Sequence, residues 1–188
     1  MGLKREPKVK ADLLKKLYPI TFAIITAAVM LTLLALTESS TRAALEAREG
    51  QQTLEMLKQV FPEMSFYIPE DDVYIIYNNG GGKIGYAFYA EGIGYGGKMV
   101  ILVGLEDKET IKGIMVVSQY EDHAYWYRLV DSNFFSQFIG LKIEDCALKR
   151  YGGVGGQVDG VTGATISSRA IVDAVRETAL EKVKSIIR

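Results

Sequence analysis

The sequence predicts an α+β architecture: a single N-terminal transmembrane helix, followed by a domain built on a mainly antiparallel sheet with flanking helices. Three observations support this prediction. Residues 17–37 form an uncharged apolar run, several short alternating segments separated by turn residues occupy the middle of the chain, and an amphipathic segment ends it. Because strands come first and helices afterwards, without regular alternation, an antiparallel sheet is favoured over a parallel one.

The N-terminal segments are defined by charge and hydropathy. Residues 1–16 form a short basic tail, and residues 17–37 are long enough to cross a hydrocarbon core as a helix. The positive-inside rule then places the tail in the cytoplasm and the remainder outside. A cleaved signal peptide and a buried core helix are the alternatives. The run lacks a small-x-small cleavage site and is long for a soluble core, so an uncleaved signal anchor is favoured.

The remainder of the chain divides into a stalk and a domain. Residues 38–60 are expected to form a stalk helix, which Phe61-Pro62 ends because a residue before proline disfavours helical backbone. Residues 61–188 then form the extracytoplasmic domain. Periodicity and turn residues predict its strands at Val73–Tyr77, Lys83–Ala90, Met99–Leu105, Ile111–Ser118 and Leu141–Leu148. Helices are expected at Tyr125–Phe138 and after Ser168.

Composition excludes several kinds of redox or binding site. Charge is nearly balanced, so there is no electrostatic footprint for nucleic acid. One cysteine, Cys146, excludes an internal disulfide and a self-contained iron–sulfur or structural zinc site, each of which needs several thiolates. One histidine, His123, disfavours a haem or His-based metal site. No catalytic or metal-binding residue is predicted, and any electron transfer would need an organic cofactor.

The most informative stretch, Asp159 to Ser168, precedes the last amphipathic run. Its four hydroxyl side chains surround a Gly163-Ala164 pair. Helix N-termini attract anions through their unpaired N–H groups and the macrodipole, and glycine lets the backbone approach a phosphate. A helix cap is the simpler interpretation, but one cap needs only one hydroxyl. The pattern therefore indicates an anion site.

This stretch resembles the flavinylation motif of the FMN-binding domain family, Asp-x-x-Ser/Thr-Gly-Ala-Thr. The resemblance implies that a flavin transferase joins FMN through its phosphate to the hydroxyl of Thr165. It also implies that the surrounding residues bind the cofactor: Asp159, Thr162, Gly163, Ala164, Ser167 and Ser168.

Two further segments are compared with the same family. Gly92 to Gly97 fits the Gly-x-Gly-x-x-Gly dinucleotide pattern, but a strand follows it where that fingerprint requires a helix, so a hairpin turn is expected. The family carries a similar Gly-Tyr-Gly-Gly segment near its flavin, which adds Tyr95, Gly96 and Gly97 as candidates. Glu121 matches the glutamate of the family's His-x-Glu-Thr-Pro-Gly-Leu-Gly segment, whereas the rest of that segment is absent here.

The overall layout resembles the G subunits of Rnf electron-transport complexes. That resemblance implies an electron-transfer subunit, not catalytic by itself, of an ion-translocating (Na⁺ or H⁺) ferredoxin:NAD oxidoreductase in a bacterial or archaeal cytoplasmic (inner) membrane. The implied partners are other membrane subunits, a flavin transferase and the lipid bilayer, with no nucleic acid.

Three alternatives remain. The related C-type subunits of sodium-translocating NADH:quinone reductases share the motif and anchor, although they carry more sequence between anchor and domain. The chain could also be a membrane-anchored module that binds a phosphorylated ligand reversibly, or a structural subunit with a relic motif.

Overall fold

The computed structural model describes residues 18–19, 21–33, 48, 50–149 and 156–186. The chain divides into two units between Gln51 and Gln52, and each is described by itself. Several predicted segments lie wholly or partly outside the described residues: the basic tail 1–16, residues 17, 20 and 34–37 of the expected membrane span, residues 38–47 and 49 of the stalk, and most of the glycine-rich loop before Gln157.

In the first unit, residues 18–19 and 21–33 are helical and expose their apolar side chains. The hydroxyls of Thr21, Thr26 and Thr32 donate to backbone carbonyls three or four residues earlier, at 2.7–3.0 Å. Among the helices that the structure describes, none combines the length and the apolar character that crossing a membrane requires.

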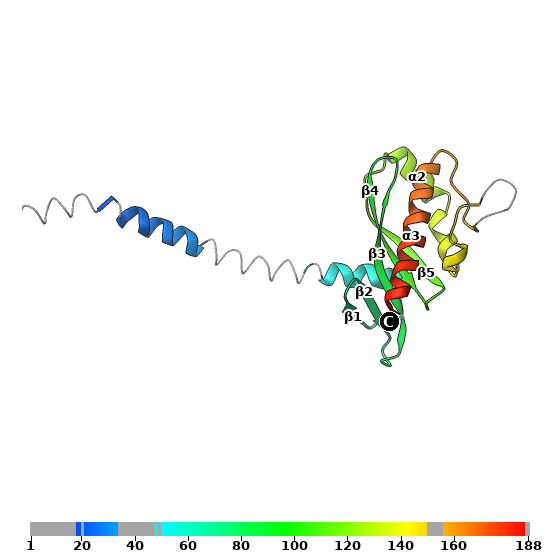
Figure 1. Ribbon diagram of the computed structural model, residues 1–188, viewed down its shortest axis with the longest axis horizontal. Helices are drawn as coiled ribbons and strands as arrows, with labels where there is room; N and C mark the ends of the chain where they lie inside the picture. Colours follow the sequence, from blue (N-terminus) through cyan, green and yellow to red (C-terminus); the bar gives the residue numbers. More distant parts are fainter. Residues whose placement is uncertain (1–17, 20, 34–47, 49, 150–155, 187–188) are drawn as a thin grey trace, which may run out of the picture. The chain divides into compact units, whose positions relative to one another are not determined.

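The second unit is built on a five-stranded antiparallel sheet in the order β1-β2-β3-β4-β5 (Figure 1). The strands are β1 (Phe66–Glu70), β2 (Val73–Tyr77), β3 (Lys83–Ile93), β4 (Lys98–Leu105) and β5 (Ile111–Gln119). The four strands predicted between residues 73 and 118 are confirmed, three of them slightly longer than expected. The predicted hairpin turn at Gly94 to Gly97 is confirmed as the β3–β4 connection. β1 was not predicted, because its sequence FYIPE lacks alternation and contains proline.

One face of the sheet is covered by helix α3 (Thr165–Ile186), which lies against β3 and β4 (Figure 1). The interface needs small residues near the start of α3. A Cβ on Gly92 of β3 would lie 2.9 Å from the Ala170 carbonyl oxygen, so a larger residue there would push α3 away. Buried residues of the larger core fill the space between α3 and the sheet, among them Phe88, Ile101, Val103, Val172 and Val175.

The opposite face is covered by the helical residues 50–60, which carry the end of the predicted stalk. Leu57 and Phe61 are fully buried there, in a second core with Ile76 and Leu102 of the sheet. Two glycines of the sheet make room for the Phe61 ring: a Cβ on Gly85 would lie 2.6 Å from it, and one on Gly104 would lie 2.8 Å from it. The last turns of the predicted stalk therefore pack as part of the folded domain.

The segment predicted as one helix over Tyr125–Phe138 is two helices. α2 (His123–Asp131) ends at Ser132, and a short 3-10 helix, η1 (Phe134–Phe138), follows. Asn133 separates them with a left-handed backbone conformation, φ 55°, which an α-helix cannot contain. Tertiary packing explains the break, because Phe134 and Phe138 are both buried in the larger core.

The predicted strand at Leu141–Leu148 is wrong. Residues Ile143–Asp145 form a 3-10 turn, η2, and the flanking residues make only isolated bridges, Thr110 with Lys142 and Leu148 with Val158. The buried residues Ile143 and Cys146 lie three apart, a spacing that suits a 3-10 turn rather than a strand.

Candidate functional site

The candidate site is the N-terminus of α3, where Thr165 is the first helical residue and is exposed. A tight turn leads into it, closed by the Ala164 N–H, which donates to the Val161 carbonyl at 3.0 Å. Gly163 has φ 80° in this turn, a conformation that glycine adopts without the strain of a Cβ. The predicted helix N-terminus with its glycine turn is therefore present.

The capping role belongs to Ser168. Its buried Oγ accepts from the Val161 N–H at 3.1 Å and donates to the Ala164 carbonyl at 2.9 Å, which ties the turn to the first helical turn. The Thr165 hydroxyl makes only a long contact, 3.5 Å to the Val161 carbonyl. Thr162 is exposed. Capping thus explains one of the four hydroxyls and leaves Thr165 available for another role.

Ser167 is the unusual member of the group. Its side chain is 1% exposed, and its Oγ has no hydrogen-bond partner in the described structure. A buried hydroxyl without a partner costs about 1–3 kcal/mol, so native proteins seldom leave one. The position of Ser167 is consistent with a hydroxyl that pairs with a ligand at the helix N-terminus.

A cavity of about 240 Å³ adjoins these residues. Its lining consists of Tyr95, Tyr125, Gly163, Ala164, Thr165, Ile166 and Ser167. The Tyr95 and Tyr125 rings meet edge to face, with centroids 5.0 Å apart and planes at 64°. Four candidates from the hydroxyl-rich stretch, together with Tyr95, therefore meet around one cavity that combines an aromatic wall with a helix N-terminus.

The loop that carries Tyr95 is held by Glu121. The Gly96 N–H donates to Glu121 Oε2 at 3.1 Å, and the Gly94 N–H donates to the Gly97 carbonyl at 2.8 Å. A Cβ on Gly94 would overlap Glu121 Oε1, so this position has to be glycine for the buried carboxylate to fit. Glu121, Gly96 and Gly97 do not line the cavity, and they position the Tyr95 loop beside it.

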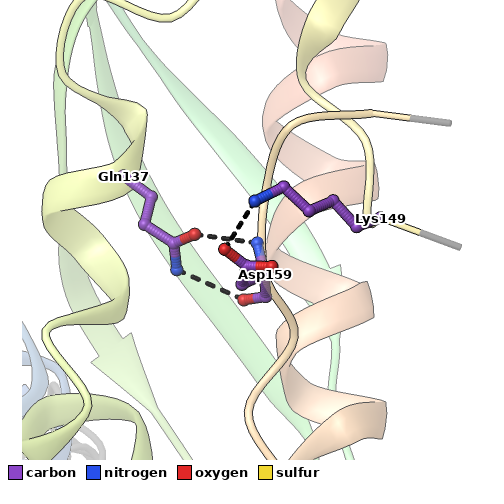
Figure 2. A network of polar contacts seen from close by, with 3 residues as sticks. All are labelled: Gln137, Lys149 and Asp159. Atoms are coloured by element: carbon purple, nitrogen blue, oxygen red, sulfur yellow. Dashed lines mark hydrogen bonds and ion pairs between the residues drawn. The ribbon is translucent and has the colours of Figure 1, made fainter. Parts of the chain in front are cut away.

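Asp159 also lies outside the cavity lining. Its carboxylate accepts from Lys149 Nζ at 2.7 Å, and the amide of Gln137 pairs with both backbone groups of Asp159, at 2.7 and 3.2 Å (Figure 2). Because the Lys149–Asp159 pair is exposed, its contribution to stability is small, while the amide pairing fixes the backbone path. Asp159 thus fixes the chain that enters the turn.

Two residues of α2 complete the site and were not among the predicted cofactor-binding residues. Tyr125 forms part of the cavity wall. The Arg128 guanidinium lies against Gly163, so closely that a Cβ on the glycine would overlap Nη1. Residues three apart share one face of a helix, so α2 presents both side chains to the turn. That spacing was the available signal in the sequence, but it did not show which element the face would meet.

The two residues singled out by composition lie elsewhere. His123 begins α2 and is exposed, and its ring stacks on Tyr127 with centroids 6.2 Å apart. Cys146 is fully buried, and burial raises the pKa of its thiol to about 12. The thiol therefore stays protonated and unreactive at neutral pH.

Comparisons with known proteins agree with this site. The family model described as "FMN-binding domain" matches residues 94–180, which span the cavity and most of α3. The G subunit of an ion-translocating oxidoreductase complex from Methanosarcina acetivorans is 32% identical over 165 residues, which cover 81% of this chain and 86% of that protein. The protein of the same name from Pseudoalteromonas atlantica is 28% identical, with 85% and 82% covered.

Solved structures with a similar chain fold were also found. The crystal structure of Shewanella oneidensis NqrC matches with a TM-score of 0.47 and 22% identity, over 66% of this chain and 70% of that one. The C-type component of the Na⁺-translocating NADH-quinone reductase from Parabacteroides distasonis matches with a TM-score of 0.47 and 23% identity, over 59% and 62%.

Proposed function

The chain belongs to the family of G subunits of ion-translocating oxidoreductase complexes, and on this premise we propose that it relays electrons through FMN esterified to Thr165. The complex would be a ferredoxin:NAD oxidoreductase that translocates Na⁺ or H⁺. Other membrane subunits of that complex would be its partners, and a flavin transferase would attach the cofactor.

The observation that carries this proposal is the arrangement at the start of α3. An exposed Thr165 hydroxyl, the buried unpartnered Ser167 hydroxyl and an aromatic-walled cavity meet within one helical turn. A phosphoester on Thr165 would place its charged oxygens at the helix N-terminus, where unpaired N–H groups and the macrodipole favour negative charge. The residues present therefore fit the phosphate end of FMN.

Each part of the site has a distinct role toward the cofactor. The first-turn N–H groups and the Ser167 hydroxyl would hold the phosphate, and Tyr95 and Tyr125 would form a wall for the ring system. When bound, FMN supplies the one- and two-electron chemistry that the protein side chains lack. A covalent tether also removes the dependence of cofactor occupancy on free FMN, which matters outside the cytoplasm.

We further propose that residues 17–37 anchor the domain to a bacterial or archaeal cytoplasmic membrane, with the N-terminus inside and the flavin on the outer face. Two features of the described helical residues favour this assignment. Their apolar side chains are exposed, and their threonine hydroxyls are paired within the helix, as lipid surroundings demand. The test is carbonate extraction of native membranes: retention of the chain in the pellet agrees with an anchor, and its release contradicts one.

The flavin assignment is tested by co-expressing the chain with a flavin transferase and viewing a denaturing gel under ultraviolet light. We expect a fluorescent band for the natural chain and for folded Ser168→Ala, and an equal or weaker band for Thr162→Ala, which alters the motif that the transferase reads. Thr165→Ala should leave the band dark. A dark natural chain, or a bright Thr165→Ala band, would refute attachment at this residue. Flavin that co-purifies but leaves on denaturation would instead indicate reversible binding.

A further inference from the structure

Arg128 presents a positive charge to the start of α3. Its guanidinium packs on the bare α-carbon of Gly163, two residues before Thr165. Neither a salt bridge nor a hydrogen bond joins this guanidinium to any residue that the structure describes. A cation placed beside a helix N-terminus adds to the positive potential there, although the two repel each other in the absence of an anion.

The surroundings point to an anion as the missing partner. The Ser167 hydroxyl, more than nine-tenths buried, also lacks a partner among the described residues, and it lines the cavity beside Thr165. Guanidinium groups bind phosphate oxygens through two parallel N–H bonds, which an ammonium group cannot do. A phosphodiester on Thr165 keeps one negative charge at neutral pH, so it would satisfy the arginine, the serine and the helix N-terminus together.

We propose that Arg128 binds the phosphodiester that links FMN to Thr165 and thereby holds the flavin against the Tyr95–Tyr125 wall. The proposal rests on the proposed function. It also gives Gly163 a second role: besides permitting φ 80°, the missing side chain leaves room for the guanidinium. Arg128 is thus a positioning residue, and α2 contributes both the wall and the cation of the cofactor site.

The experiment compares flavin order in the full-length, flavin-loaded chain and in Arg128→Gln. Covalent loading is first measured by gel fluorescence, and only loaded protein is analysed. The phosphorus NMR shift then reports the surroundings of the diester, and time-resolved fluorescence anisotropy reports the mobility of the ring. In Arg128→Gln, we expect the ratio of ordered to mobile flavin to fall about tenfold or more, as for loss of a charge-assisted hydrogen bond.

Two controls give the result a single meaning. Arg176→Gln removes the same charge from an exposed position about three turns further along α3 and should behave like the natural chain. Arg128→Lys keeps the charge and the aliphatic stem but loses the fork, so its ratio should lie between those of the natural chain and Arg128→Gln. It also provides the measurement if Arg128→Gln does not fold.

The possible failures are distinguishable. Loaded Arg128 variants with the same phosphorus shift and anisotropy as the natural chain would overturn the role of Arg128, while attachment at Thr165 would stand. A natural chain that never acquires covalent flavin would instead overturn the proposed function. An equal loss of order in Arg176→Gln would mean that net charge, and not the position of Arg128, controls the flavin.

Discussion

Two neighbouring serines of α3 should respond in opposite ways to the same substitution in the flavin-free chain. Ser167 and Ser168 are both buried in the first turn of the helix. The Ser168 hydroxyl pairs with the Val161 N–H and the Ala164 carbonyl, whereas the Ser167 hydroxyl has no partner among the described residues. We therefore expect Ser168→Ala to destabilise the domain and Ser167→Ala to stabilise it.

The expected magnitudes come from these partners. Ser168→Ala leaves the Val161 N–H unpaired, which costs about 1–3 kcal/mol, while the Ala164 carbonyl keeps its bond from the Ser168 N–H. Ser167→Ala removes a buried hydroxyl whose desolvation is not compensated, which gains about 1 kcal/mol. The higher helix propensity of alanine, about 0.5 kcal/mol, favours both variants equally. The two variants should thus differ by about 2–4 kcal/mol.

The assay is thermal and urea unfolding of both variants in a Thr165→Ala background, which keeps flavin absent. A difference of this size corresponds to roughly 4 °C in Tm per kcal/mol for a domain of this size. The reasoning is refuted if Ser167→Ala destabilises the domain as much as Ser168→Ala does. That outcome would mean that the Ser167 hydroxyl already has a partner within the protein, and it would remove one of the supports for a phosphate site.

The remaining predictions concern the cores on the two faces of the sheet. Phe61→Ala should cost about 3–5 kcal/mol in urea unfolding because the ring fills the space above Gly85 and Gly104, whereas exposed Lys58→Ala should cost little; a loss below about 1 kcal/mol for Phe61→Ala would contradict packing of this helix on the sheet. Cys146 should resist iodoacetamide at pH 8 until the chain is unfolded, and rapid labelling of the native protein would show the thiol to be accessible. Because the unfolded thiol ionises above about pH 9 while burial raises the folded pKa to about 12, stability should decline as pH rises through that interval.

Local sequence patterns were sufficient where a strand is buried on one or both faces. β2 to β5 follow apolar alternation bounded by glycine or polar turns, and each was located within a few residues. β1 has no such pattern, and its pairing with β2, from Phe66 opposite Tyr77 to Glu70 opposite Val73, defines it as a strand. The η2 turn was mistaken for a strand because burial at Ile143 and Cys146 depends on neighbouring elements, not on local alternation.

The candidate site divides in the same way. The motif from Asp159 to Thr165 located the threonine proposed for attachment, and the glycines before β4 located the Tyr95 loop. The partition of roles within those residues needed the structure: Ser168 caps, Ser167 has no partner among the described residues, and Glu121 and Asp159 hold backbone rather than line the cavity.

By itself, the sequence determined four strands of the sheet, the helix that follows the hydroxyl-rich turn and the threonine at its start, because each depends on residues adjacent in the chain. Only the tertiary structure decided that α2 lies beside that turn and brings Tyr125 and Arg128 to it. No local pattern encodes this contact, since it arises from the packing of α2, η1 and α3 on one face of the sheet around shared core residues such as Leu129 and Phe134.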